Sequence, residues 1–378
     1  MRDELPFLLI VALRLVLPLA IPRYPLPGIV ATMLIDSIDD IAFRPFSGAM
    51  PVEYQAYDKA LDIYYLTIAY LATMRNWENT LAVEISRFLF YFRLLGVVLF
   101  ESTHLRALLV IFPNTFEYFF GFIEIVALAW NVRRLDRRMI VGAAAGIWLF
   151  IKLPQEYWIH VAQLDVTREL ARHPPAIPVL TGIAGAIGLG GRLAFQKWVP
   201  APDHALAVDG DDQSRRLPVV ERRRAGPGWG IVSNESLEKI TMVSLISIIF
   251  AQILPDVRAS DLQILLSVTS LIVANTVIFL SWTRRGAGWT SAARHFVAMF
   301  VVNCTLAMAA YVVHPLGGQR VHKENTLFFL FMLTLLITLY NRYRPEYLAR
   351  ANRRVRCRLT VRSCANHLPD RPDRLRHA

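Results

Sequence analysis

Apolar runs long enough to cross a lipid bilayer recur along this chain, and no other feature constrains its fold more strongly. A helix needs about 20 mainly apolar residues to span the hydrocarbon core, where all its backbone polar groups must be bonded internally. With 54% hydrophobic residues and a mean hydropathy of +0.38, the chain is predicted to be an all-α, polytopic integral membrane protein. Four of the clearest runs are residues 239–255, 262–282, 296–313 and 325–340.

Apolar runs in the N-terminal part bring the expected total to about ten transmembrane segments. They are residues 6–35, 59–75, 81–100, 111–130, 139–152 and 176–191. The first of these is either one long broken helix or two short ones. Its four prolines, Pro18, Pro22, Pro25 and Pro27, cannot all lie inside one regular helix. The side of the membrane that holds the N-terminus therefore stays open.

Loop charge predicts the orientation, because cytoplasmic loops carry an excess of Lys and Arg. The loops rich in these residues are 131–138, 192–233, 283–294 and the tail from 342. The loops poor in them are 101–106, 256–261 and 314–324. We therefore expect a multi-pass protein of the cell membrane with its basic linker and tail in the cytoplasm. The same rule explains the net charge of +11, so we expect no nucleic-acid partner.

Composition divides the chain into four predicted parts. Residues 1–191 form a membrane half rich in polar residues, and residues 234–341 form a half of four plain helices. Between them, residues 192–233 are rich in charge, proline and glycine, which predicts a largely unpacked linker. Residues 342–378 are basic and poor in apolar side chains, which predicts disorder. This tail could bind anionic lipid headgroups of the bilayer, or it could serve only to set the topology; protein partners are not indicated.

Glycine recurs in two of the apolar runs. Gly142 and Gly146 have the G-x-x-x-G spacing, and Gly182, Gly185 and Gly188 lie three residues apart. The pattern disfavours a nucleotide-binding loop, because no strand precedes these glycines and no Lys-Ser/Thr follows them. We expect close helix packing in lipid instead.

An acidic stretch separates the first two apolar segments and is the strongest candidate site. Asp36, Asp39 and Asp40 follow one apolar run, and Asp58 and Asp62 lie one turn apart at the start of the next. Carboxylates on adjacent helix ends favour a cation, which could be a divalent metal, a proton or a charged substrate group. Asp36, Asp39, Asp58 and Asp62 are the catalytic candidates, and Asp40 is a binding candidate. The alternative is an exposed acidic loop; a metal requirement stays open.

Charged residues inside the predicted spans carry further information, since such residues are usually paired or functional. Glu84 and Arg87 lie three residues apart on one helix face, so we expect an ion pair, or two side chains that reach the inner surface. Arg93 is deeper, and Glu124 lies at a compatible depth on the following span. We therefore predict a structural Arg93–Glu124 bridge.

Three further residues are candidates for binding substrate or a cation at the outer face. Glu117 lies near the outer end of its span and could join the acidic site. Glu156 and His160 are four residues apart, so on a helix they share one side, as metal ligands or an acid–base pair would. The alternative for this segment is an interfacial helix anchored by Tyr157 and Trp158.

The acidic stretch is similar in outline to the CDP-alcohol phosphotransferases, which carry D-x-x-D-G-x-x-A-R at one helix end and G-x-x-x-D-x-x-x-D at the next helix start. The matching residues are Asp36, Asp39, Arg44, Asp58 and Asp62. This resemblance implies two bound metal ions. The pattern departs from the family at Asp40, Phe43 and Tyr54, which stand where the family has glycine, alanine and glycine. Loop charge also places the stretch outside, where no CDP-alcohol is found.

Membrane glycosyltransferases that use polyprenyl-phosphate sugars resemble this layout in having acidic residues in the first outer loop of a helix bundle. The resemblance implies a carboxylate base, here Asp36, Asp39 or Asp40, and often a metal to balance the phosphate. Three functions follow as hypotheses. The first is a transferase-like membrane enzyme acting on a lipid-linked or other membrane substrate. The others are a transporter that couples to a cation through Asp62, Glu117 and Glu124, and a non-catalytic membrane partner protein.

Overall fold

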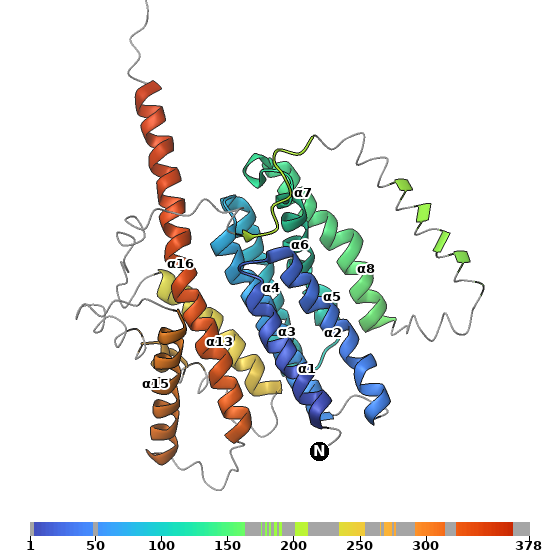
Figure 1. Cartoon of the computed structure of the whole chain (residues 1–378), viewed down its shortest axis with the longest axis vertical. Coiled ribbons are helices and arrows are strands. Elements are labelled where there is room, and N and C mark those ends of the chain that lie inside the picture. The colour runs from blue at the N-terminus through green and yellow to red at the C-terminus, as the bar shows by residue number, and fades with distance from the viewer. Residues whose placement is uncertain are drawn as a thin grey trace, which may run out of the picture.

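The computed structural model describes residues 4–47, 52–162, 201–210, 234–253, 292–313 and 323–365, with short pieces within 175–190 and 265–276. All regular elements in these ranges are helices (Figure 1). The N-terminal part contains α1 (Glu4–Val16), η1 (Leu17–Ala20), α2 (Pro25–Ser47), α3 (Val52–Asn76), α4 (Thr80–Thr103), α5 (Ala107–Ile111), α6 (Thr115–Ala127), η2 (Val132–Arg134), α7 (Arg137–Gly146), η3 (Ile147–Lys152), α8 (Leu153–Glu156) and η4 (Tyr157–Val161). The C-terminal part contains α13 (Asn234–Ile253), α15 (Ala292–Val313) and α16 (Lys323–Ala365).

Helix α3 lies at the centre of the molecule. It packs against α1, α2, α4 and α6 from the N-terminal part and against α13 and α16 from the C-terminal part. Its residues from Ala60 to Met74 are almost all buried, which is the pattern of a helix surrounded on every side. The two parts of the chain therefore share one hydrophobic core.

The N-terminal helices have two distinct ends. At one end, which we call the basic end, the α3–α4 connection meets the arginine-rich loop: Glu78 is bonded to Arg133, and the Asn79 amide donates to the Val132 carbonyl oxygen at 3.1 Å. The other end, which we call the acidic end, contains the start of α3, the end of α4 and the start of α6. The candidate carboxylates of α3 and the basic loop therefore lie at opposite ends of the bundle.

The opening apolar run forms two helices, not one broken helix. Helix α1 ends at Val16, a 3₁₀ turn contains Pro18, and α2 starts at Pro25. Proline at these positions costs little, because the first residues of a helix have no intrahelical acceptor for their N–H groups. Helix α2 then continues to Ser47, so Asp36 lies within a helix and not in an exposed acidic loop, which was the alternative.

Part of the predicted linker is packed. The backbone N–H of Asp203 donates to the Ala129 carbonyl at 2.8 Å, and that of Gly210 donates to the Arg23 carbonyl at 2.6 Å. Arg134 also contacts the Asp203 carboxylate at 2.7 Å. Residues 201–210 therefore lie against the basic end, contrary to the prediction of an unpacked segment; the rest of 192–233 lies outside the described residues.

The basic tail is helical further than its composition predicted. Helix α16 runs without interruption to Ala365, well past the protein bundle in Figure 1. Residues 342–365 are therefore helical and not disordered, because arginine, leucine and alanine are good helix formers and the helix is already nucleated by its apolar part. Arg350 fixes it to α3 by donating to the Met74 carbonyl.

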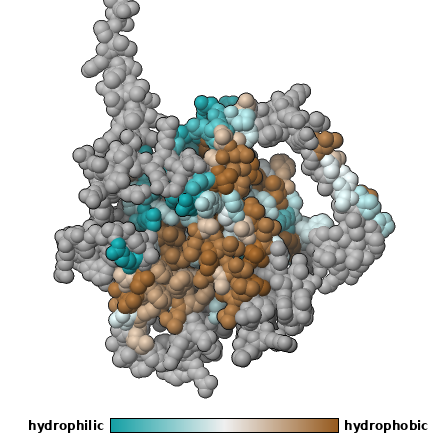
Figure 2. Space-filling model, in the orientation of Figure 1, coloured by the Kyte–Doolittle hydropathy of each residue, from teal (hydrophilic) through white to brown (hydrophobic). Residues whose placement is uncertain are grey.

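Among the residues that the structure describes, three helical segments are long and apolar enough to cross a membrane: Ala107–Ala127, Ser236–Ile253 and Thr326–Ala351. Apolar side chains also gather on the outer face of the bundle, as Figure 2 shows. On α1 alone, Leu8, Leu9 and Val16 are each about 60% exposed. An apolar surface of this kind is typical of a protein that contacts lipid.

Close packing occurs at a different glycine from those predicted. In the described part of the chain, a Cβ added at Gly142 or Gly146 would meet no atom within 4 Å. At Gly96 of α4, by contrast, a Cβ would lie 2.1 Å from the Cβ of Phe112. This approach brings the Phe112 carbonyl close to α4, where it binds Arg93.

Candidate functional site: an arginine–aspartate cluster beside a pocket

Arg14 is the centre of the acidic end. This residue of α1 is buried, with 2% of its surface exposed, and its guanidinium contacts one carboxylate oxygen each of Asp36, Asp58 and Asp62. The contact with Asp62 is 2.5 Å long. Two helices therefore contribute carboxylates to a cation from a third, and nearby the Tyr64 hydroxyl donates to the Leu15 carbonyl at 3.0 Å.

The convergence of Asp36, Asp58 and Asp62 was predicted, but the arginine that they contact was not. Oxygens of these three carboxylates lie within 4.8 Å of one another, close enough to share one ion. Arg14 supplies positive charge at this place, so part of the need that we assigned to a bound cation is met by the chain itself. Three carboxylates still face one guanidinium, and each carboxylate side chain is 29–41% exposed. The side chains of Asp39 and Asp40 lie outside the described residues.

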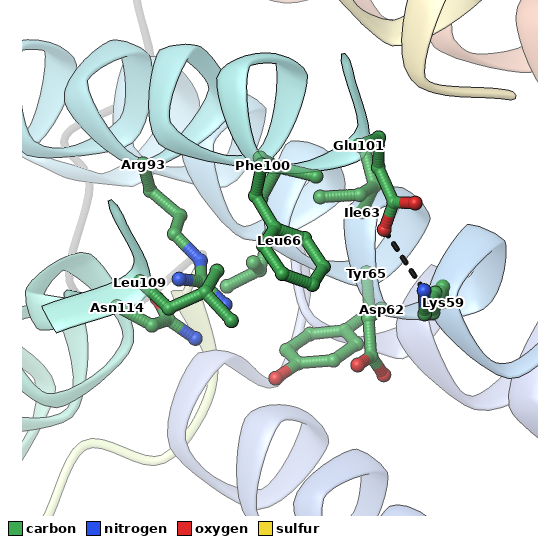
Figure 3. Close-up of a pocket in the computed structure, with 11 residues that line it drawn as sticks. Lys59, Asp62, Ile63, Tyr65, Leu66, Arg93, Phe100, Glu101, Leu109 and Asn114 are labelled. Carbon is green, nitrogen blue, oxygen red and sulfur yellow. Dashed lines mark hydrogen bonds and ion pairs between the residues drawn. The ribbon is translucent and has the colours of Figure 1, made fainter. Parts of the chain in front are cut away.

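Asp62 also lines a pocket between α3, α4 and the start of α6 (Figure 3). The pocket has a volume of about 130 Å³, and its polar lining comprises Lys59, Asp62, Tyr65, Arg93, Glu101 and Asn114. Lys59 contacts the Glu101 carboxylate at 2.9 Å on one side of the pocket, while Arg93 extends from the opposite side (Figure 3). Carboxylate, phenol, amide and two cationic groups thus meet at one opening.

Glu117, which we predicted could join the acidic site, is bonded to two residues that line this pocket. It is 8% exposed and accepts hydrogen bonds from the Tyr65 hydroxyl at 3.0 Å and from the Asn114 amide at 2.7 Å. Both donors also line the pocket. Glu117 does not contact the Arg14 cluster directly; Tyr65, one turn after Asp62 on α3, lies between them.

Glu156 and His160 share one side of their segment, as their spacing predicted. The His160 Nε2 atom lies 3.0 Å from the Glu156 carboxylate, which also accepts from the Asn114 backbone N–H at 3.4 Å. Burial lowers the pKa of His160 below its usual value, although the charge of Glu156 opposes this. No third metal-type ligand accompanies the pair among the described residues. Tyr157 and Trp158 are exposed, as the interfacial alternative requires.

Two predicted ion pairs are wrong. Arg93 donates to the Phe112 carbonyl at 3.1 Å, while the Glu124 carboxylate accepts from the Trp77 indole at 2.6 Å. Matching depth therefore did not bring Arg93 and Glu124 together. Glu84 and Arg87 are not bonded to each other either. The Glu84 side chain is exposed, and the charges of both residues act on the Tyr347 hydroxyl. Glu124 is also remote from Glu117, about 10 Å along the helix axis at 1.5 Å per residue.

A second buried polar cluster joins the two parts of the chain at the other side of α3. The Glu238 carboxylate of α13 accepts from the Tyr70 hydroxyl at 2.7 Å and from Arg344 of α16 at 2.5 Å. The Tyr91 hydroxyl donates to the Glu238 backbone carbonyl at 3.3 Å. Glu238 lay just outside the predicted span and Arg344 in the predicted tail, so sequence reasoning missed both. It also missed Arg14, although an arginine inside an apolar run is itself a functional indication.

No protein family, no curated protein and no solved structure matches this chain. The function must therefore be argued from the geometry of the site.

Proposed function

We propose that this chain is a multi-pass membrane enzyme of the transferase type, acting on a lipid-linked or other membrane substrate. The observation that carries the proposal is the double position of Asp62, which contacts the buried Arg14 and lines the pocket. Carboxylates within a membrane helix bundle are costly and are usually retained for function. A pocket that opens beside such a group is the default place for a substrate.

In this proposal Asp62 is the general base. One of its oxygens contacts Arg14, which orients the carboxylate, while the side chain faces the pocket, where an acceptor hydroxyl could lose its proton. Asp36 and Asp58 contact the same guanidinium, so its positive charge is divided among three carboxylates and offsets less of the charge of Asp62. A substrate from the bilayer could enter between the apolar helices, and only its polar group would need to occupy the pocket.

We further propose about ten spans, with the acidic end outside the cell membrane. The support is the separation of the two ends: the arginine-rich loop and residues 201–210 lie at the basic end, and positive loops stay in the cytoplasm. Cysteine labelling checks this in a background without Cys304, Cys357 and Cys364. In intact cells, an impermeant maleimide should label Thr103→Cys at the acidic end but not Ala205→Cys at the basic end. If only Ala205→Cys is labelled, the protein has the opposite orientation in the membrane.

The substitution Asp62→Asn tests the catalytic role. Asp36 and Asp58 still face Arg14 in this variant, so the protein should fold and insert normally. General bases contribute about 10²–10⁴-fold to rate, and we expect transfer to fall by at least about 100-fold. Untargeted mass spectrometry of membrane lipids should detect a species that changes on expression of the wild type and of Asp203→Asn, a matched change at the basic end, but not of Asp62→Asn.

A different outcome would favour the cation-coupled transporter, for which the 4.8 Å grouping of Asp36, Asp58 and Asp62 is the specific observation. In that case wild-type expression alters no lipid, and uptake into vesicles depends on pH or sodium and on Asp62. If neither lipid composition nor uptake responds to Asp62, the cluster is structural, as in a non-catalytic partner protein.

A further inference from the structure

Arg93 is the cation of the pocket that lies deepest within a helix of the bundle. It lies in the middle of α4, a helix that packs within the bundle, and its side chain crosses toward the pocket from the side opposite Lys59 (Figure 3). A guanidinium at such a place is expensive, because it must leave water. An arginine that is retained there is expected to have an anionic partner.

Within the described part of the chain no carboxylate is bonded to Arg93, although Glu117 lies near enough to interact with its charge. A guanidinium has five N–H donors. The single hydrogen bond of Arg93 goes from Nη1 to the neutral Phe112 carbonyl, and its Nε atom is buried without any acceptor. A buried donor left unsatisfied is destabilising, and more so when it is charged. The pocket is the direction from which an acceptor could come.

The neighbouring carboxylates are engaged elsewhere. Glu117 accepts from Tyr65 and Asn114, and Glu101 contacts Lys59 on the far side of the pocket. The guanidinium of Arg93 therefore faces the pocket with N–H donors that no carboxylate accepts. Planar guanidinium groups bind carboxylates and phosphates through two parallel hydrogen bonds.

The size of the pocket limits what can bind. A volume of about 130 Å³ has room for several water molecules. It can therefore hold a single tetrahedral anion. The surrounding apolar helices would have to accommodate the rest of a membrane substrate.

We propose that this pocket binds the phosphate group of a membrane lipid and that Arg93 is its anion-binding residue. The inference rests on the proposed function, since it names the substrate class of the same site. Arg93 and Lys59 approach the pocket from opposite sides, and Asp62 lies on the α3 side between them. Arg93 would then bind the phosphate beside the carboxylate that acts as base.

Thermal unfolding in nanodiscs tests the proposal without requiring turnover. A ligand that binds only the folded state raises the unfolding midpoint. Nanodiscs of phosphatidylcholine containing phosphatidic acid should raise the midpoint of the wild type by a few degrees over phosphatidylcholine alone. The apparent affinity should fall about tenfold or more in Arg93→Gln, as loss of a charged hydrogen bond predicts. Arg106→Gln, a matched change of an exposed arginine before α5, should behave as the wild type.

Further arms identify the source of the anion. If inorganic phosphate alone gives the whole shift, and Arg93→Gln abolishes it, the lipid part of the proposal is overturned. If Arg93→Gln responds to phosphatidic acid as the wild type does, the site itself is overturned. Should Arg93→Gln not fold, Arg93→Lys keeps the charge but loses the fork, and it should bind with intermediate affinity; unchanged binding in this variant contradicts the proposal.

Asp62→Asn separates this inference from the proposed function. Removing a negative charge from the pocket should leave phosphatidic acid binding intact or stronger. Retained binding together with retained transfer in Asp62→Asn would remove the enzyme assignment to Asp62 and leave the phosphate site standing. Loss of transfer in Asp62→Asn, without any binding that depends on Arg93, would support Asp62 as the base and overturn the phosphate site.

Discussion

Replacing Arg14 by methionine is expected to destabilise the protein by about 3 kcal/mol. Methionine preserves much of the side-chain volume, so the main loss is the positive charge. Asp36, Asp58 and Asp62 would then face one another without the guanidinium. Because these carboxylates are 29–41% exposed, water offsets part of their repulsion, and we place the effect at the lower end of the range for broken buried pairs. The midpoint of thermal unfolding in detergent measures it.

Two comparisons show whether the effect is electrostatic. Arg106→Met, an exposed arginine at the same end, should change stability by no more than about 0.5 kcal/mol. Adding Asp62→Asn to Arg14→Met should recover part of the loss, because the double variant has one fewer repelling charge. A double variant as unstable as Arg14→Met alone would mean that packing, and not charge, determines the effect.

The effect of Arg14→Met should also depend on pH. Burial raises the pKa of Asp58, and Arg14 opposes this, so removal of Arg14 should raise the pKa further. A carboxyl whose pKa is higher in the folded than in the unfolded state stabilises the protein below its unfolded value, near 3.9, and loses that contribution as the pH rises through its folded pKa. The deficit of Arg14→Met should therefore be largest at neutral pH and shrink toward pH 4.

The apolar runs predicted the all-helical architecture well, because spacing and length alone determine where a chain can form buried helices. They predicted less well which residues meet. Asp36, Asp58 and Asp62 converge as expected, since they lie on adjacent helices near a short connection. Their partner Arg14 could not be identified by loop reasoning, because it lies inside the first apolar run and reaches the cluster only through helix packing.

The errors have a common physical origin. Depth in the membrane was used to pair Arg93 with Glu124, but depth leaves open which face of each helix carries the charge. The Phe112 carbonyl and the Trp77 indole, both neutral, each bond to one of these residues instead. The local spacing of Glu84 and Arg87 likewise did not produce an ion pair, and Glu84 is exposed.

Replacing Arg344 by methionine is expected to cost about 3–5 kcal/mol, the largest effect outside the acidic end. The Glu238 and Arg344 side chains are only 11% and 8% exposed, so little water is present to solvate the carboxylate that remains. Tyr70 would still donate one hydrogen bond to it, but a single neutral donor does not replace a cation. Since Glu238 and Arg344 come from α13 and α16, and Tyr70 from α3, contacts between the two parts of the chain should weaken first.

The matched control is Arg342→Met, two residues earlier on the same helix, where the side chain is exposed and lies over the Tyr343 ring. This variant should retain nearly the wild-type unfolding midpoint. Glu238→Gln combined with Arg344→Met should be more stable than Arg344→Met alone, because the amide can still accept from Tyr70 and no buried charge remains. If Arg344→Met unfolds at the wild-type temperature, the Glu238–Arg344 contact does not stabilise the joint between the two parts. Their association must then depend on apolar packing around α3 and on the remaining hydrogen bonds, such as that of Arg350 to the Met74 carbonyl.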